Sequence, residues 1–306
     1  MNRVASAAEG WGDEPSVLIF ADREQDLAAA VEAARSVGAR IVGAEPTAGA
    51  LERLSRQVGV DSVLIELDGT DELTRERLID WANHAVSEGT TSAVISIPSS
   101  LIDAVTARLD ESRIDLLCDA GIEERTAALG MMLAQRRHRL HDHGIEAEAE
   151  RLRRLSEEVA RIAGALAELS SSARSSSYAP HRDFPEIEGE AKVDANMVRS
   201  LIRLRRMRDQ FFPRDLFADP AWDMLLDLMA ARLEQSRVAV SSLCIAAAVP
   251  ATTALRWIRT LTDHGLFVRR ADPDDGRRIF IELSDIAGDA LAAYFQTAHQ
   301  LGLRVA

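Results

Sequence analysis

The sequence predicts two folded parts of different class, an α/β part followed by a smaller α+β part, with a helical connector between them. Three observations support this prediction. Short apolar runs alternate with helical patterns over residues 17–118, and a heptad seam follows over 152–169. Over 251–283, a helix, a glycine, a strand, a charged tip and a second strand come in that order. At 306 residues, the chain is long enough to bury two cores.

The composition narrows the class of protein. No apolar run approaches the roughly 18 residues that a membrane span needs, and the N-terminus lacks the apolar core of a signal peptide. The two cysteines, Cys118 and Cys244, are too far apart for a zinc spacing or a disulfide framework. We therefore expect a cytoplasmic protein with no membrane contact. The sequence contains no Gly-rich phosphate loop, metal-ligand cluster or nucleophile–base pair, so we expect neither an enzyme nor a cofactor or metal.

The first folded part covers residues 16–125 and follows a tail at 1–15 that we expect to be disordered. The expected strands cover 17–20, 41–43, 62–67, 93–97 and 114–118. The expected helices cover 26–37, 51–58, 73–87 and 101–109. Short apolar strands that alternate with helices are typical of a parallel sheet covered on both faces. Five such strands fit a flavodoxin-like order, with any site at the carboxyl ends of the strands.

Acidic residues follow three of these strands. Asp22 follows the first, Glu66 and Asp68 lie at the end of the third, and Asp119 follows the fifth. In length and rhythm, this part resembles the receiver domain of bacterial response regulators. The resemblance implies a metal-binding acidic pair after the first strand, where this chain has Ala21 and Asp22. It also implies a phospho-accepting Asp at the end of the third strand, where Glu66 stands and Asp68 is a weaker candidate.

The departures from the receiver pattern affect its chemistry. Phosphoryl transfer needs a carboxylate nucleophile and a metal, and the extra methylene of Glu66 and the missing acid at Ala21 weaken both. Receivers also carry a Lys after the fifth strand, where this chain has Cys118 and Asp119. We interpret this part as a phosphorylation-independent pseudo-receiver in which Glu66 imitates the charge of a phosphorylated Asp. In the alternative interpretation, these carboxylates are ordinary residues at strand ends.

The helical connector is expected over 126–172. Its apolar residues recur at alternating steps of three and four, which is the a/d pattern of a short two-stranded coiled coil. The seam consists of Leu152, Leu155, Val159, Ile162, Leu166 and Leu169. A single amphipathic helix packed on the first part is the alternative. Residues 173–191, rich in Ser, Pro and Glu, predict a flexible linker.

The second folded part covers 192–306. Helices are expected over 194–212 and 220–236, with a short strand over 238–240. A helix that starts at Ser241 and a turn at Val249–Pro250 precede the helix over 251–264, which Gly265 ends. Two strands, 266–268 and 279–281, flank an arginine-rich tip, and a last helix runs over 285–301. This order is the layout of a winged helix-turn-helix.

The wing carries a specific motif. It consists of Gly265-Leu266, Arg269-Arg270, Asp272-Pro273-x-Asp275-x-Arg277 and Leu283-Ser284. In this motif, the second part resembles the MarR family of bacterial transcription regulators. The resemblance implies that Asp275 braces Arg277, and that Arg277 contacts DNA. The chain departs from the family pattern at Gly276, where another Arg is common, and this puts one phosphate contact in doubt. A surface hairpin with solvated charges is the alternative.

The winged-helix interpretation assigns roles to ten residues. Thr252, Thr253 and Arg256 are expected at base edges in the major groove. The expected contacts to the DNA backbone are Ser241, Arg259, Arg269, Arg270, Arg277 and Arg278, with Asp275 as their brace. In MarR-like proteins, the first and last helices of the domain pair across a two-fold axis. The resemblance therefore implies a homodimer on a pseudo-palindromic double-stranded site.

The charge distribution agrees with a polyanion-binding C-terminal part. Residues 192–306 hold 16 Lys or Arg against 14 Asp or Glu, whereas residues 1–191 hold 20 against 35. We therefore expect a homodimeric, sequence-specific transcription regulator whose first part senses a signal or binds a regulatory protein. Two alternatives stay open. One is a response regulator switched by phosphorylation, and the other is an interaction scaffold that has lost DNA binding.

Overall fold

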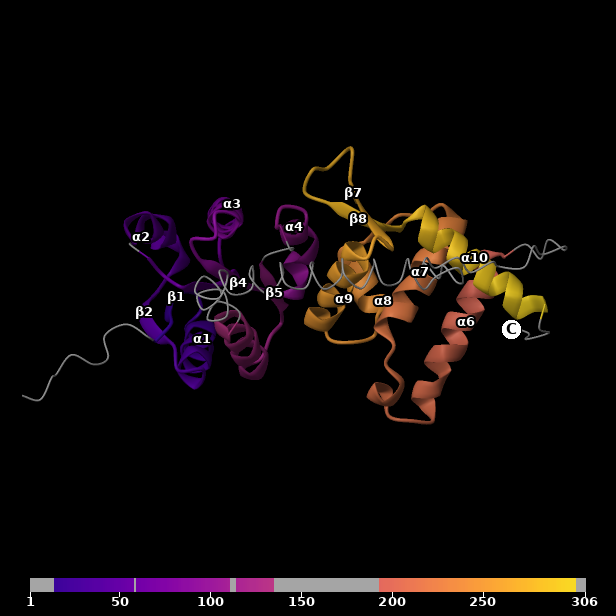
Figure 1. Cartoon of the computed structure of the whole chain (residues 1–306), viewed down its shortest axis with the longest axis horizontal. Coiled ribbons are helices and arrows are strands. Elements are labelled where there is room, and N and C mark those ends of the chain that lie inside the picture. The colour runs from indigo at the N-terminus through magenta and orange to yellow at the C-terminus, as the bar shows by residue number, and fades with distance from the viewer. Residues whose placement is uncertain (1–13, 58, 111–113, 135–192, 301–306) are drawn as a thin grey trace, which may run out of the picture. The chain divides into compact units, whose positions relative to one another are not determined.

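A computed structural model describes residues 14–57, 59–110, 114–134 and 193–300 of the chain (Figure 1). The predicted coiled-coil seam and the linker lie outside the described residues, as does most of the predicted N-terminal tail. Within the described ranges, no single helix is both long and apolar enough to cross a bilayer. Two helices joined by a bend, Val240–Ala246 and Ala251–Asp263, pass the same test of length and composition only when taken together.

The first part contains a five-stranded, fully parallel sheet, which confirms this element of the predicted fold class. The strand order is β2-β1-β3-β4-β5. The strands are β1 (Ser16–Phe20), β2 (Arg40–Glu45), β3 (Ser62–Glu66), β4 (Ser92–Ile97) and β5 (Asp115–Cys118). Every residue of β1 and β3 is buried because these strands have neighbours on both sides and helices on both faces. This burial accounts for the unbroken apolar runs in the sequence.

Helices cover the two faces of the sheet. They are α1 (Glu24–Ser36), α2 (Ala50–Arg56), α3 (Glu72–Ser87), α4 (Ile102–Thr106) and a further helical stretch over 122–134. In Figure 1, α2, α3 and α4 lie on one face, and α1 lies with residues 122–134 on the other. Leu129 and Leu133 of that stretch are buried, so its packed face continues beyond the predicted boundary at 125.

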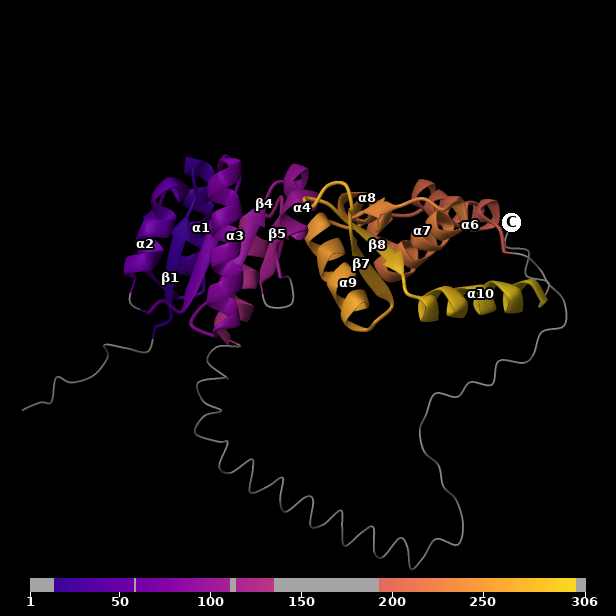
Figure 2. The same ribbon diagram turned by 90° about the horizontal axis from the view of Figure 1, so that it is seen from above.

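The second part contains the elements of a winged helix-turn-helix. The helices are α6 (Ala195–Met207), α7 (Pro220–Glu234), α8 (Val240–Ala246), α9 (Ala251–Asp263) and α10 (Asp285–Gln300). The strands β6 (Val238–Ala239), β7 (Phe267–Ala271) and β8 (Ile279–Leu283) form an antiparallel sheet in the order β6-β8-β7. Figure 2 shows α10 running on from β8 as one straight helix.

The start of this part differs from the sequence prediction. The helix expected over 194–212 ends at Met207, and two short 3-10 turns follow at Arg208–Gln210 and Arg214–Phe217. Pro213 separates the two turns, since a proline disfavours helical geometry in the residue before it. Asp219 caps α7 by accepting from the backbone N–H of Trp222, with Pro220 as the first helical residue, as the sequence indicates.

Arginines of α6 pair with acids of α7. Arg199 Nη1 lies 2.6 Å from an Asp227 carboxylate oxygen, and its Nη2 lies 2.9 Å from Glu234. Arg205 Nε lies 2.8 Å from Asp223. These pairs hold the first two helices of this part together beside their apolar contacts. The basic face of α6 is therefore at least partly occupied within the fold.

We predict that Gly265→Ala lowers the free energy of unfolding by about 1 kcal/mol, because a residue with a Cβ is strained in the left-handed backbone conformation. Gly265 connects α9 to β7 with φ of +70°. A Cβ there would meet no neighbouring atom, so the strain comes from the backbone alone. Urea denaturation measures the change. Gly276→Ala in the wing tip is the matched control, since that position is also open but has no positive φ. Equal losses in the two variants would contradict this explanation.

Candidate functional site

The helix-turn-helix is formed by α8 and α9. The chain bends by 108° between them, within the range of about 90–120° typical of this motif. Ala248 in the turn takes a φ of 55°, and the backbone N–H of Ala254 closes the first turn of α9 by donating to Pro250 O. Leu255, Ile258 and Leu261 are buried and fix α9 to the rest of this part. Another side of α9 faces β5 of the first part, where Arg256 and Arg259 line a small pocket with Asp115 and Leu116.

The structure separates the three residues predicted to read bases. Arg256 is exposed, Thr253 is half-buried, and Thr252 is 1% exposed. Trp257, which the sequence analysis did not single out, is 37% exposed beside Arg256. Arg256 is therefore the predicted base-reading residue that is available to a ligand in this arrangement.

The wing consists of β7, β8 and the tip between them. Arg270 Nε lies 3.6 Å from Glu282 across the two strands, whereas Arg269 is half-buried. The tip is closed by two backbone hydrogen bonds, from Asp272 N to Arg278 O and from Arg278 N to Asp275 O, both 3.0 Å. Arg277 and Arg278 lie in this turn, and both are exposed.

The acid predicted to brace the wing has two partners. The Asp275 carboxylate accepts from the backbone N–H of Arg277 at 3.0 Å and lies 3.6 Å from Arg278 Nε. The side chain of Arg277 instead pairs with Glu72, at 2.5 Å. In this arrangement, Asp275 holds the backbone of Arg277 and the guanidinium of Arg278.

The described residues of the two folded parts belong to one compact unit, and polar contacts join them. The backbone N–H of Ser241 donates to one Asp103 carboxylate oxygen at 2.9 Å, and its hydroxyl donates to the other at 2.6 Å. The Thr252 hydroxyl accepts from Cys118 N at 2.9 Å and donates to Cys118 O at 3.1 Å. Two residues predicted to contact DNA therefore bind the α/β part.

Two predicted phosphate contacts are also engaged. Arg259 Nη1 lies 3.8 Å from Asp115 of β5, and Arg277 lies against Glu72 at the start of α3. Of the predicted DNA-contacting set, four members (Ser241, Thr252, Arg259 and Arg277) thus have partners on the α/β part.

The predicted degenerate receiver site lies at the carboxyl ends of β1, β3 and β5. Asp22, after β1, accepts from the backbone N–H of Thr47 at 2.9 Å and from the hydroxyls of Thr47 and Thr70 at 2.5 and 2.9 Å. A carboxylate that accepts this many local bonds ties the loops after β2 and β3 to the end of β1. Asp68 pairs with Arg23 in the neighbouring loop.

Glu66 is 2% exposed and is bound by a residue that the sequence analysis missed. Arg125 Nε and Nη2 reach the two carboxylate oxygens of Glu66 at 2.6 and 2.9 Å, a bidentate pair. Arg125, itself 6% exposed, also donates to Ala120 O. A buried carboxylate held this way is neutralised within the fold, so its charge is not presented at the surface.

Asp26 of α1 lies beside this pair, with an Oδ1–Nη2 distance of 3.5 Å to Arg125. Burial raises the pKa of the Asp26 carboxyl, and the neighbouring Glu66 carboxylate raises it further, while Arg125 acts in the opposite direction. The charged form of Asp26 is thus disfavoured in the folded protein.

At β5, Asp119 and Cys118 show no arrangement for phosphoryl chemistry. Asp119 takes a left-handed φ of 48°, and its carboxylate accepts from the backbone N–H of Ser99 at 3.1 Å. Burial and then the charge of Asp119 raise the pKa of the Cys118 thiol to about 12, which keeps it protonated and unreactive. Across the described ranges, no group of three or more His, Cys, Asp or Glu could hold a metal ion.

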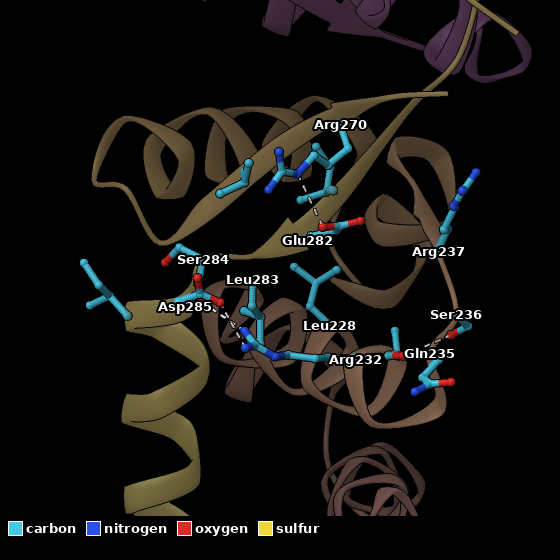
Figure 3. Close-up of a pocket in the computed structure, with 14 residues that line it drawn as sticks. Leu228, Arg232, Gln235, Ser236, Arg237, Arg270, Glu282, Leu283, Ser284 and Asp285 are labelled. Carbon is cyan, nitrogen blue, oxygen red and sulfur yellow. Dashed lines mark hydrogen bonds and ion pairs between the residues drawn. The ribbon is translucent and has the colours of Figure 1, made fainter. Parts of the chain in front are cut away.

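A pocket of about 620 Å³ lies between α7, the base of the wing and the start of α10 (Figure 3). Apolar walls such as Leu228 are mixed with charged side chains. Arg232 reaches Asp285 at 3.1 Å, and Arg270 pairs with Glu282. The first pair links α7 to α10, and the second joins the two strands of the wing. A third arginine of the lining, Arg237, lies 3.7 Å from Asp272.

Sequence reasoning missed Arg125 and the acids Glu72, Asp103 and Asp115. Nothing in the local periodicity marks them, because each acts on a residue that is distant in the chain. The acidic balance of residues 1–191 was the one available signal. This balance indicates that the first part can complement a basic surface, but it does not identify which acidic residues make the contacts.

Comparisons with known proteins give limited likeness. No family model and no curated protein matches the chain. Part of it is similar to the MepR–DNA complex of S. aureus, at 19% identity over 33% of this chain and 79% of that chain, with a TM-score of 0.26. The transcriptional regulator Tm0710 of Thermotoga maritima is 18% identical over 35% of this chain and 69% of that chain, with a TM-score of 0.24. A probable transcriptional regulator of Pseudomonas aeruginosa is 25% identical over 33% of this chain and 80% of that chain, with a TM-score of 0.22. Likeness at these TM-scores carries no argument about this chain.

We predict that Asp26→Asn stabilises the protein at pH 7, since its pKa in the folded state is raised. The stability that protonated Asp26 provides is full below its unfolded pKa, about 3.9, and is lost as the pH rises through the folded value. The gain from Asn should therefore shrink as the pH falls towards 4. Urea denaturation across this range measures it.

Asp80→Asn is the control with the opposite sign. A hydrogen bond from Arg108 lowers the pKa of Asp80, so its carboxylate stabilises the fold above the unfolded pKa and loses this effect as the pH falls. This variant should be less stable than the wild type at pH 7. If both substitutions change stability in the same direction, the Asp26 explanation is wrong.

Proposed function

We propose that this chain is a sequence-specific DNA-binding transcription regulator of the winged helix-turn-helix type. The observation that carries the proposal is the combination of α9 and the wing. An exposed Arg256 on α9 and exposed arginines at the wing tip, Arg277 and Arg278, stand on two elements that neighbour each other in this motif. A helix of this kind fits the major groove, and an arginine tip fits the adjacent phosphates or minor groove.

The roles of the arginines differ. In this proposal, Arg256 makes a bidentate contact to guanine, worth about 1–3 kcal/mol of discrimination between bases. The wing arginines contact phosphates, which adds affinity for any sequence. Thr253 and, once released from Cys118, Thr252 complete the base-reading set.

We further propose that the active form is a homodimer joined through α6, the turns after it, and α10. Large apolar side chains are exposed on these elements. They are Leu204, Met207, Phe211, Phe212, Leu216 and Phe217 on the first, and Ile286 and Tyr294 on α10. Burying them against a second copy would remove this surface from water. Two-fold symmetry would place two recognition helices about one DNA turn apart, on a pseudo-palindromic site.

The α/β domain is proposed to act as a receiver-like sensory or interaction domain that does not depend on phosphorylation. Glu66 replaces the acceptor, and Arg125 already occupies both of its oxygens. A phosphodonor would have to displace a buried ion pair before reacting there. The interaction-scaffold alternative is disfavoured by the arginines that α9 and the wing tip retain.

A DNA-binding titration tests the proposal. Duplexes are selected from a randomised pool with the full chain, and the selected and scrambled sequences are then compared at two salt concentrations. Selective, salt-dependent binding is expected. Absence of any selected duplex, even for the opened variant defined below, would reject the regulator function in favour of the scaffold.

We predict that Arg277→Ala weakens binding to selected and scrambled duplexes alike and reduces the salt slope by about 0.9, the loss of one phosphate contact. Arg256→Ala should instead narrow the difference between the two duplexes by about 1–3 kcal/mol. Arg56→Ala on α2 is the control, because it removes an exposed arginine that pairs with Glu52 of its own helix. An Arg256→Ala protein with unaltered preference would remove that residue from base reading.

We also predict that acetyl phosphate with Mg²⁺ leaves both the mass of the protein and its DNA affinity unchanged. The reason is the buried Glu66–Arg125 pair and the lack of a second acid at Ala21. Intact-protein mass spectrometry and the same titration measure this. A stable gain of one phosphoryl group, accompanied by altered affinity, would favour the phosphorylation-switched alternative.

A further inference from the structure

We infer that the acidic α/β domain covers the DNA-binding face of α8, α9 and the wing tip, so that this chain holds its own DNA-reading surface closed. The inference rests on the proposed function and adds its regulation. The occupant of the face is a defined surface of the same chain: the edge of β5 (Asp115–Cys118), Asp103 of α4, and Glu72 at the start of α3.

The contact at Ser241 has the chemistry of a phosphate contact. Asp103 offers two anionic oxygens, and Ser241 donates its backbone N–H to one and its hydroxyl to the other. A DNA phosphate would take the same two donors, since backbone N–H groups and hydroxyls are the usual positioning contacts to the DNA backbone. Asp103 and a phosphate cannot occupy this position together.

Thr252 closes the edge of the sheet. β5 is the last strand in the order, so one side of it has no strand neighbour and its N–H and C=O groups need other partners. The Thr252 hydroxyl accepts from Cys118 N and donates to Cys118 O, which satisfies both groups. Because this hydroxyl is buried, a base can reach it only after the two domains separate.

Charge complementarity extends across the face. Asp115 lies 3.8 Å from Arg259, and Glu72 lies 2.5 Å from Arg277, so carboxylates stand where DNA phosphates would pair with these arginines. Both pairs are partly exposed and contribute little individually. They contribute to specificity instead. With Asp103, they place three acids of the α/β domain opposite residues expected to hold DNA.

An apolar contact supports the polar ones. Ile102, Val105 and Leu116 of the α/β domain belong to the same buried cluster as Leu243 and Leu255 of the helix-turn-helix. A face that combines polar pairs with a modest apolar core is typical of domain contacts that open and close. DNA would bind only the open form, so its apparent affinity falls in proportion to the open fraction.

The test compares two full-length triple variants that change net charge equally. The interface variant is Glu72→Ala/Asp103→Ala/Asp115→Ala. The control variant is Glu32→Ala/Glu52→Ala/Glu88→Ala. These three acids are exposed, and Glu52 and Glu88 pair with Arg56 and His84 of their own helices. We expect the interface variant to bind the selected duplex at least about tenfold more tightly than the wild type, and the control to stay within about twofold.

Hydrogen–deuterium exchange gives a readout that needs no DNA. Amides of 115–118 and 251–256 should exchange faster in the interface variant than in the wild type or the control, while those of β1 and β3 stay protected. Protection of β1 and β3 also verifies that the variant is folded. If the triple variant does not fold, the single variant Asp103→Ala replaces it in both measurements. Selected DNA added to the wild type should speed exchange at 115–118, because linkage is reciprocal.

The outcomes separate the two proposals. If the wild type selects a duplex and the interface variant binds it no better, or no better than the control, the closed face is wrong and the regulator function stands. If the interface variant shows faster exchange and still no protein selects any duplex, the regulator function fails and this inference with it.

Discussion

A parallel sheet leaves an unpaired edge, and in this protein one such edge meets α9. The outer side of β5 carries the N–H and C=O of Cys118, and Thr252 satisfies both with a single hydroxyl. Around this contact, Asp103 binds Ser241, and apolar residues of α4 and β5 join the core beneath α8 and α9. The need to satisfy a sheet edge therefore governs where the helix-turn-helix packs.

The buried Glu66–Arg125 pair argues against phosphoryl transfer to the end of β3 in the α/β domain. At the end of β3, a carboxylate would have to be free to act as an acceptor, and here both of its oxygens are bound within the fold. Asp22 is likewise committed to Thr47 and Thr70. Carboxylates at strand ends thus serve the structure of the loops, which favours a domain that works by contact.

The closed face would explain the excess of acidic residues in the first part of the chain. An excess of acid in residues 1–191 weakens DNA binding if it is spread at random, yet three of these acids lie opposite Ser241, Arg259 and Arg277. A partner or signal that draws the α/β domain away would release the winged helix without altering it. Regulation and DNA reading would then compete for one set of side chains.

Sequence alone determined the parallel sheet and the winged helix, because strand and helix periodicity, Gly265 and Pro220 act over a few neighbouring residues. It also located the acids at the strand ends and the arginines of the wing. Only the tertiary structure decided their partners: Arg125 for Glu66, Glu72 for Arg277 and Cys118 for Thr252. Each pair joins residues far apart in the chain, and no local pattern encodes which distant side chain the folded backbone will bring within hydrogen-bonding distance.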